Sequence, residues 1–299
     1  MRSLENTQKF VNGKMVFCGI DIHKHHWNLC YFCDGMAVEK LCIESDFKRL
    51  LHHTERIYST AREIRFVYEA GFSGFHLHRQ LKTHGYDCIV TPPNRVPQLG
   101  DKVKTDKRDA SKLAQFLAGG LLKKVYVPPL SIESDRQVLR LRKSTQSKLT
   151  RVKNQIKSFL NLHGITWPKA NGNRWTKKYI SWLNHLEFEF PSQRVVMEEY
   201  LNEYHFLRNK IATLTRRLRE MSRQETYAKP YKRLVSCKGV GLITAMTFLL
   251  ELHDLCRFPS AEKFASPELF DLPVFCEYHI GTPFPHYTCL RQWLPKKQQ

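Results

Sequence analysis

Short apolar runs separated by turn residues fill the first 128 residues of the chain. Runs rich in β-branched and aromatic side chains predict strands. Between them, apolar residues three and four positions apart predict helices. The predicted strands are Met15–Ile22, His26–Cys33, Met36–Ile43, Ile64–Glu69 and Tyr86–Thr91, and the predicted helices are Asp46–Tyr58, Gly74–His84 and Thr105–Leu117.

Turn residues between these runs indicate how the strands connect. Asp34 and Gly35 supply a tight turn, which predicts a meander of the first three strands. Pro92 and Pro93 end the fifth strand, because proline has no N–H to donate to a ladder. The order β-β-β-α-β-α-β-α is that of an α/β ribonuclease H-like fold. We predict this domain for residues 14–128, after a flexible lead-in at residues 1–13.

Helical periodicity dominates the predicted second segment, residues 131–228. One apolar stripe is formed by Val138, Leu141, Thr145, Leu149, Val152, Ile156 and Phe159. A second stripe alternates spacings of three and four from Met197 to Met221, as in a coiled coil. Two such helices predict either an antiparallel hairpin within one chain or a seam between two subunits.

A glycine turn marks the predicted third segment, residues 230–266. Gly239-Val240-Gly241 separates two apolar helical stretches and resembles the turn of a helix-hairpin-helix element. Backbone N–H groups at such a turn bind anions. We therefore predict that Lys238, Gly239 and Gly241 contact nucleic-acid phosphates. Residues 267–299, with five prolines, are predicted to form an atypical tail.

The chain is strongly basic, with a formal net charge of +20 at pH 7. Residues 131–233 contain 22 Lys and Arg against 9 Asp and Glu, and residues 136–157 contain eight basic residues and no acid. So long a bias is better explained by a bound polyanion than by a solvated helix face. We predict DNA as the partner. The predicted nucleic-acid contacts in this segment are Arg140, Arg142, Lys143, Lys148 and Arg151.

Composition also indicates the compartment. The longest apolar stretches are far shorter than the ~20 residues of a membrane span, and the polar N-terminus has no secretory apolar region. Cys30-x-x-Cys33 has no second such pair, and residues three apart on a strand point to opposite faces. We predict nine reduced cysteines without structural zinc, in a cytoplasmic, nucleoid-associated protein with no membrane partner.

Four carboxylates carry the candidate chemistry. Asp21 and Glu69 end predicted neighbouring strands, while Asp106 and Asp109 share one face of a predicted helix. Gathered carboxylates repel one another unless a cation lies between them, and hard oxygen ligands suit Mg²⁺ or Mn²⁺. Two such ions can stabilise the attacking and leaving oxygens of phosphodiester cleavage. We predict that these four acids are both the metal ligands and the catalytic residues.

Residues next to the acids suit a phosphate backbone. Three basic residues next to Asp106 and Asp109 in the sequence are predicted to contact phosphate, namely Lys104, Lys107 and Arg108. The glycines that follow Glu69 permit close approach of a phosphate. His23, His25 and His26, beside Asp21, are predicted to pack or to contact phosphate rather than to bind zinc.

Three segments resemble the DEDD-type transposases of the insertion-sequence-110 family, namely Gly19–Lys24, Tyr68–Gly71 and Lys104–Ala110. Later segments, Lys238–Gly241 and Phe258–Ser266, are similar to the start of that family's C-terminal domain. The resemblance implies a RuvC-like domain with the four acids above at its active site, and a helical dimerising segment. It further implies a homo-oligomer that recombines an insertion element into DNA, in some members directed by a guide-type RNA from the element.

The sequence departs from that family after Ser266. There the family continues into a motif with a nucleophilic serine, whereas this chain contains no serine beyond Ser266. We therefore expect a copy that is truncated or frameshifted, and defective in any covalent DNA–protein step. Two alternatives are a stand-alone branched-DNA nuclease that uses the same acids and a non-catalytic DNA- or RNA-binding remnant. A sugar-kinase or actin-like protein would need a second glycine-rich phosphate loop, which the sequence lacks.

Overall fold

The computed structural model describes residues 4–93, 106–167, 172 and 174–253. The chain divides into two compact units, Met1–Val127 and Pro128–Gln299. The first unit contains the sheet, and the described part of the second is helical. The division coincides with the change in periodicity from short alternating runs to long helical stripes.

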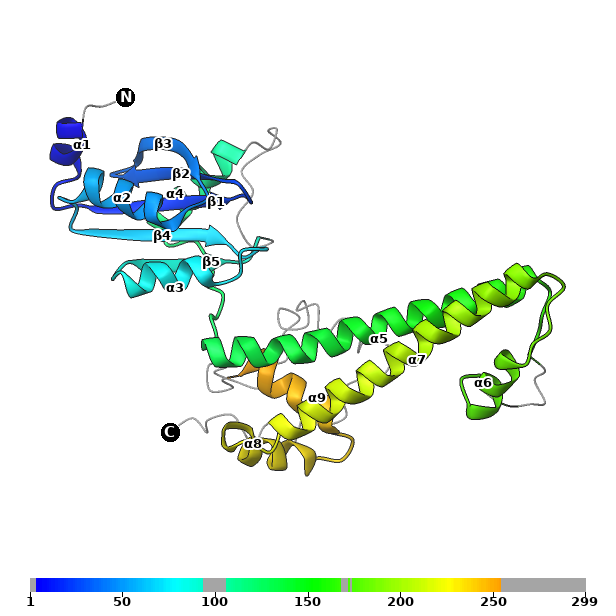
Figure 1. The fold of residues 1–299 in the computed structure, drawn as a ribbon. Coiled ribbons are helices and arrows are strands. Elements are labelled where there is room, and N and C mark those ends of the chain that lie inside the picture. Colours follow the sequence, from blue (N-terminus) through cyan, green and yellow to red (C-terminus); the bar gives the residue numbers. More distant parts are fainter. Residues whose placement is uncertain (1–3, 94–105, 168–171, 173, 254–299) are drawn as a thin grey trace. The chain divides into compact units, whose positions relative to one another are not determined.

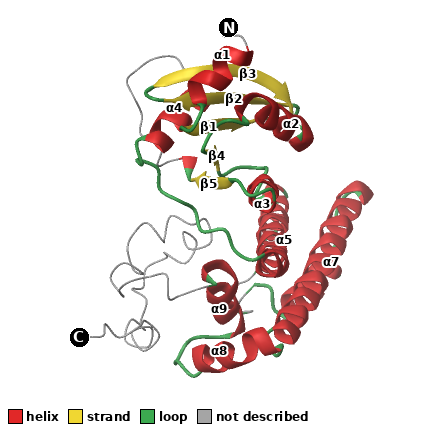
Figure 2. Cartoon of the chain, turned by 90° about the vertical axis from the view of Figure 1, so that its left-hand side faces the viewer, coloured by secondary structure: helices red, strands yellow, loops and turns green. Residues whose placement is uncertain are grey.

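A mixed five-stranded sheet forms the first unit, in the order β3-β2-β1-β4-β5 (Figures 1 and 2). Its strands are β1 (Met15–Ile22), β2 (His26–Cys33), β3 (Met36–Glu44), β4 (Glu63–Glu69) and β5 (Asp87–Thr91). Neighbours among β1, β2 and β3 are antiparallel, whereas β4 runs parallel to β1 and β5 parallel to β4. The predicted element order is confirmed, and the sheet with its helices fits a RuvC-like domain.

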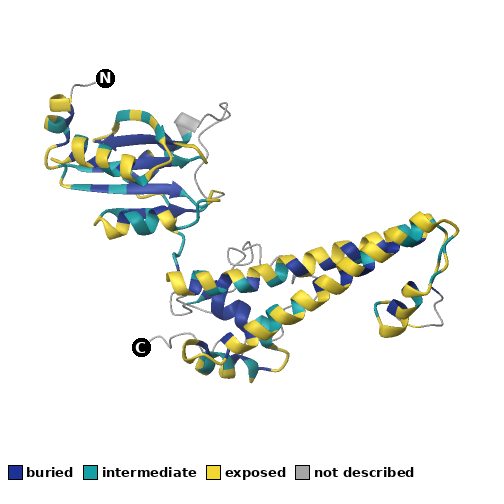
Figure 3. Cartoon of the chain, in the orientation of Figure 1, coloured by how far each residue is buried: buried dark blue, intermediate teal, exposed yellow. Residues whose placement is uncertain are grey.

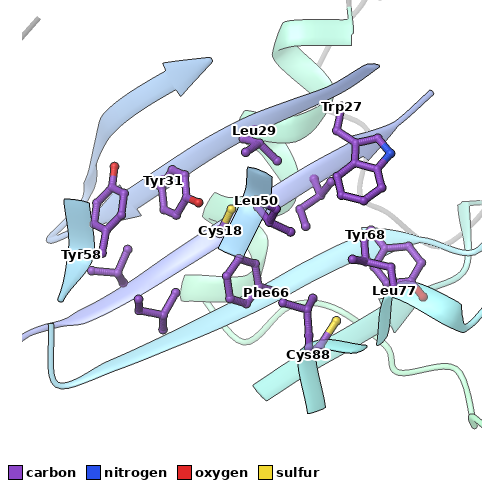
Figure 4. Close-up of a cluster of buried hydrophobic side chains, with 14 of the residues drawn as sticks. Cys18, Trp27, Leu29, Tyr31, Leu50, Tyr58, Phe66, Tyr68, Leu77 and Cys88 are labelled. Carbon is purple, nitrogen blue, oxygen red and sulfur yellow. The ribbon is translucent and has the colours of Figure 1, made fainter. Parts of the chain in front are cut away.

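The main core lies on one face of this sheet, under α1 (Leu4–Val11), α2 (Phe47–Tyr58) and α3 (His76–Thr83). Figure 4 shows large side chains of this core, contributed by alternate strand positions and by α2 and α3. Tyr31 stacks on Tyr58 with ring centroids 4.1 Å apart, and its hydroxyl lies 2.8 Å from Thr54 Oγ1. Burial of a side chain such as Phe66 contributes about 1.5–3 kcal/mol.

The opposite face is covered by α4 (Asp106–Ala118). Ala110 and Ala114 belong to a cluster with Cys30 on this face, whereas Cys33 belongs to the core on the other face. The prediction that these two cysteines point to opposite sides is therefore confirmed. The six described cysteines are all free thiols.

Helix α1 corrects one prediction, because residues 4–11 are helical rather than part of a flexible lead-in. Val11 at its end is fully buried. Gln8 Nε2 donates to the carbonyl oxygen of Arg56 at 3.0 Å, and Thr60 Oγ1 donates to that of Gln8 at 2.8 Å. These long-range contacts order a short helix that local sequence does not reveal.

The second unit is built on two long helices, α5 (Leu130–Leu162) and α7 (Pro191–Met221), that lie side by side (Figure 1). Arg142 Nε donates to Thr215 Oγ1 at 2.8 Å, and Gln193 Nε2 lies 3.1 Å from His163 Nδ1. The start of each helix thus meets the end of the other, so the pair is an antiparallel hairpin. The predicted seam between subunits stays a prediction.

One stripe of each long helix is buried and the rest is exposed (Figure 3). Leu149, Val152 and Ile156 lie in this stripe as predicted. The predicted position Leu141 is instead 46% exposed, and Leu139 is buried in its place. Leu139 packs in a second cluster near the base of the hairpin, so the stripe shifts around the helix there.

Shorter helices close the two ends of the hairpin. The helix α6 (Lys177–Asn184) packs with Trp167 and the neighbouring parts of α5 and α7. At the other end lie α8 (Glu225–Val235), α9 (Leu242–Thr247) and the π-helix η3 (Phe248–Leu252), packed on Leu218 and Met221. The predicted tail, residues 267–299, lies outside the described residues.

Candidate active site

Asp21 and Glu69 lie at the carboxyl ends of neighbouring parallel strands, Asp21 one residue before the last of β1 and Glu69 at the end of β4. Ile20 of β1 pairs with Tyr68 of β4, and the next residues on the two strands are these acids. Neighbouring strands lie about 4.8 Å apart, so the two backbone positions are adjacent. The sequence prediction that Glu69 stands beside Asp21 is confirmed at the level of the backbone.

Both acids lie on the α4 face of the sheet. Ile20 and Tyr68 belong to the core on the opposite face. Successive residues of a strand alternate between faces, so Asp21 and Glu69 point toward the side that α4 covers. Both are partly exposed, as a site open to a substrate requires.

The glycine at position 19 brings α4 close to β1. A Cβ atom there would lie 2.1 Å from the carbonyl oxygen of Ala110 and 2.7 Å from the backbone nitrogen of Ala114. Only glycine tolerates such an approach between strand and helix. The helix turn between Ala110 and Ala114 therefore lies directly over Gly19, two residues before Asp21, and Asp109 directly precedes this turn in the chain.

Asp109 occupies this first part of α4. Its side chain is 21% exposed and lies 3.7 Å from Lys112 Nζ. Asp106 begins the helix, and its side chain lies outside the described residues, as do those of Lys107 and Arg108 and all of Lys104. Where side chains are described, no three His, Cys, Asp or Glu groups are placed to hold a metal ion. The four-acid site therefore stays a prediction.

His23 is the side-chain partner of Asp21. Its Nε2 lies 3.0 Å from Asp21 Oδ2, and its ring stacks on that of His26 with centroids 4.7 Å apart. The His23 backbone N–H donates to the carbonyl of His26 at 3.0 Å, which closes the β1–β2 turn. The sequence predicted that these histidines lie beside Asp21, and in the structure His23 is the one whose ring contacts the Asp21 carboxylate.

Three buried polar residues of this face were not predicted from sequence. Asn28 of β2 is 5% exposed and pairs directly with Asp21. Thr91 of β5 is fully buried and pairs with Glu69. Ser111 of α4 is 7% exposed. A polar residue inside an otherwise apolar strand is the signal that could have revealed Asn28, whereas Thr91 ends its strand and carries no such signal.

The segment that follows Glu69 forms an exposed rim. Phe72 is 73% exposed, although it is a large aromatic side chain. The Tyr68 hydroxyl donates to the carbonyl oxygen of Gly74 at 2.9 Å, and Gly74 adopts a positive φ of 58°. The loop is thus anchored at its far end and presents Phe72 to solvent.

The predicted basic contacts on α5 fall into two groups. Arg140 is bound to Glu251, with Nε and Nη2 each 2.8 Å from a carboxylate oxygen, and Arg142 is bound to Thr215. Lys148 and Arg151 are exposed, and Lys143 is partly exposed. Nucleic-acid contact by these residues stays a prediction.

The glycine turn predicted near residue 240 separates α8 from α9. Gly239 has a φ of 87°, which favours glycine, and Gly241 is the N-cap of α9. Both glycines and Lys238 are exposed. Phosphate binding there also stays a prediction. Within the described residues, no helix is both long and apolar enough to cross a membrane.

Known proteins match both units of the chain. Residues 18–165 match a family described as Transposase, the DEDD type of insertion sequence IS110, and residues 231–266 match the family described as Transposase IS116/IS110/IS902. The chain is 32% identical over 210 residues to the putative transposase y4qE of Sinorhizobium fredii, which covers 70% of this chain and 50% of that protein. It is 28% identical over 245 residues to the transposase for insertion sequence element IS1533 of Leptospira borgpetersenii. The aligned region covers 81% of this chain and 70% of that protein.

The chain thus spans about half the length of the first of these relatives. The first family match contains all four predicted acids and the basic helix α5, and the second contains the glycine turn. The resemblance inferred from the short motifs is therefore confirmed. The chain belongs to the insertion-sequence-110 family of transposases.

Proposed function

We propose that this protein cleaves and transfers DNA strands in the movement of an insertion sequence, with divalent metal ions held by Asp21, Glu69, Asp106 and Asp109. The observation that carries the proposal is the adjacency of Asp21 and Glu69 on the face that α4 covers. The close approach at Gly19 supports it, because the turn of α4 that directly follows Asp109 is held against β1 two residues from Asp21.

The donor chemistry fits a hard cation. The site offers carboxylate oxygens, the ligands that Mg²⁺ and Mn²⁺ prefer, and the paired positions on β1 and β4 leave like charges side by side. When bound, such ions supply charge stabilisation to the attacking and leaving oxygens of a phosphodiester. A polyanionic substrate also needs cationic protein groups, which the exposed Lys148 and Arg151 on α5 can provide.

The chain's own residues orient the site. The carboxylate of Asp21 can only accept hydrogen bonds when ionised, so His23 donates from Nε2 and holds Oδ2 in one direction. The stacked His26 fixes the His23 ring in turn. Asp21 therefore keeps its second oxygen for another partner, and the pair is arranged before a substrate arrives.

Partners follow from the same proposal. DNA is the substrate, and a guide-type RNA from the element is a second candidate ligand of the basic surfaces. Self-association is supported by apolar side chains exposed on α7, among them Phe206 and Val195 at 62% and 57% exposure. A homo-oligomer built through this helix would cover them.

Cleavage of a branched DNA with Mg²⁺ tests the proposal, with wild type compared with Asp21→Asn. The matched control is Asp34→Asn, which removes an acid of the same unit at a turn where Asn also tolerates the φ of 48°. We expect cleavage by wild type and the control and none by Asp21→Asn.

Three outcomes would contradict the proposal in whole or in part. Salt-sensitive DNA binding without cleavage by wild type would identify a non-catalytic binding protein. Cleavage that survives Asp21→Asn would place the chemistry elsewhere. Cleavage without joined products, when a target DNA is added, would favour a stand-alone nuclease over a transposase.

A further inference from the structure

The hydroxyl of Thr91 is the most informative polar atom of the α4 face. Thr91 is fully buried, and its Oγ1 has no hydrogen-bond partner. Nearly all buried hydroxyls in proteins are hydrogen-bonded, because a desolvated donor without a partner is unfavourable. An unsatisfied hydroxyl at this position therefore indicates a partner that reaches it only in another state of the site.

Its position identifies that partner. Thr91 pairs with Glu69 across the β4–β5 ladder, so the two residues are lateral neighbours about 4.8 Å apart on the same face. Cys88 and Val90 belong to the core on the other face, which places Thr91 on the α4 side with Glu69. A carboxylate at this distance is within reach of a threonine hydroxyl.

The backbone around Thr91 is fixed on both sides. Its carbonyl oxygen accepts from the N–H of Ala70 at 2.7 Å, and the carbonyl of Val90 accepts from the N–H of Val125 at 2.7 Å. Because the strand is held between β4 and the following segment, the Thr91 backbone has a fixed position relative to Glu69. Such rigidity is what a residue that orients a metal ligand requires.

A polar row crosses the sheet at this level. Asn28, Asp21, Glu69 and Thr91 occupy β2, β1, β4 and β5 in that order, each beside the next. The two acids are central and the two neutral residues flank them. A neutral donor orients a carboxylate without neutralising it, whereas a lysine or arginine at the same position would compete with a cation.

We propose that Thr91 is a positioning residue of the candidate active site, and that its hydroxyl donates to the carboxylate of Glu69 when that carboxylate holds a divalent cation. The inference rests on the proposed function. It assigns Thr91 a role through Glu69, without contact with the DNA. The apolar isostere valine would pack equally well at this buried position, so the hydroxyl is not needed for folding.

The test is direct Mn²⁺ binding to the full chain, measured by electron paramagnetic resonance without DNA. Thr91→Val removes the hydroxyl at nearly constant volume, and Thr91→Ser retains it. We expect Thr91→Val to weaken Mn²⁺ binding by about 10–100-fold, the usual loss for a group that orients a metal ligand. Thr91→Ser should bind Mn²⁺ as wild type does.

The matched control is Thr54→Val on the opposite face of the sheet. Thr54 is also fully buried, but its hydroxyl already bonds to Tyr31 and to the carbonyl of Leu50, each at 2.8 Å. This change should lower stability and leave Mn²⁺ binding unchanged. Thr91→Val should instead weaken Mn²⁺ binding, while its stability should equal or exceed that of wild type.

The result identifies which inference fails. Equal Mn²⁺ affinity of wild type and Thr91→Val, with binding lost in Glu69→Gln, would overturn the role of Thr91 and keep the metal site. Absence of Mn²⁺ binding by wild type, or binding that survives Glu69→Gln, would overturn the proposed function itself.

Discussion

Arg140 donates from Nε and Nη2 to the two carboxylate oxygens of Glu251, at 2.8 Å each, although 111 residues separate them in sequence. Arg136 completes the arrangement, with Nε 2.9 Å from the carbonyl oxygen of Leu250 and 3.3 Å from Glu251 Oε2. The glutamate thus joins the π-helix η3 to the first part of α5. Its hydrogen bond to Arg140 raises the pKa of that guanidinium.

Removal of this carboxylate should destabilise the second unit. The Glu251 side chain is 3% exposed and that of Arg136 is 10% exposed, so Glu251→Gln leaves a buried cation without its counter-charge. We expect a loss of about 3–5 kcal/mol in the free energy of unfolding, measured in urea by circular dichroism. Glu220→Gln, which removes the exposed pair with Arg217, is the control and should change stability by less than about 1 kcal/mol. Equal effects of the two changes would contradict this role.

Because Arg140 is bound to Glu251, we expect other basic residues of α5 to contact DNA. Arg151 is exposed, whereas the guanidinium of Arg140 already donates to both carboxylate oxygens of Glu251. Arg151→Ala should weaken DNA binding and reduce the slope of log affinity against log salt by about 0.9, as expected for one lost phosphate contact. Arg140→Ala should leave that slope unchanged and lower stability instead. Fluorescence anisotropy across a salt series measures both, and a reduced slope for Arg140→Ala would contradict the assignment.

Gly19 should be intolerant of any side chain. The new Cβ would meet the Ala110 carbonyl at 2.1 Å, and backbone cannot move aside as a flexible side chain can. Gly19→Ala should therefore cost about 1–3 kcal/mol of stability and displace α4 together with Asp109. Metal-dependent cleavage should fall further than the fraction folded. Gly119→Ala, at the other end of α4 with its nearest neighbour at 3.5 Å, is the control. A Gly19→Ala protein with normal activity would show that α4 does not position the site.

Acid should destabilise the first unit through Glu39. Its Oε2 accepts from His53 Nε2 at 2.9 Å and from the Tyr58 hydroxyl at 3.0 Å. The hydrogen bond from His53 lowers the pKa of Glu39. A carboxyl with a lowered folded-state pKa contributes stability above its unfolded pKa, about 4.3, and loses it as the pH falls through the folded value.

Urea unfolding at a series of pH values measures this contribution. Glu39→Gln should be less stable than wild type at pH 7, and the difference should shrink below about pH 4.3. Asp46 also accepts a hydrogen bond, at the N-cap of α2, so Asp46→Asn controls for the general effect of acid on this unit. A constant difference between wild type and Glu39→Gln at every pH would contradict the assignment.

Local sequence predicted the strands and the relative position of Asp21 and Glu69 well, because alternating apolar residues and turn residues fix the sheet. It could not predict helix α1 or the pair Arg140–Glu251, since both depend on partners distant in sequence. It also gave no weight to Thr91 as a site residue, because a threonine at a strand end is ordinary until its register partner is known. Positions set by local periodicity were thus predictable, and those set by tertiary pairing were not.

Phe72 should contribute to recognition of unpaired DNA. It is 73% exposed on the loop after Glu69, beside the candidate active site. An exposed aromatic ring next to a DNA-cleaving site can stack on a base that is not paired, and each such stack is worth about 1–3 kcal/mol. Phe72→Ala should therefore weaken binding of branched DNA or of single strands, while binding of fully paired duplex, whose bases are already stacked, should not change. Phe72→Trp should restore the affinity, since any aromatic ring can stack. Anisotropy titrations with branched and duplex DNA of equal length distinguish the cases, and equal losses on both substrates would assign Phe72 to backbone contact or loop structure instead.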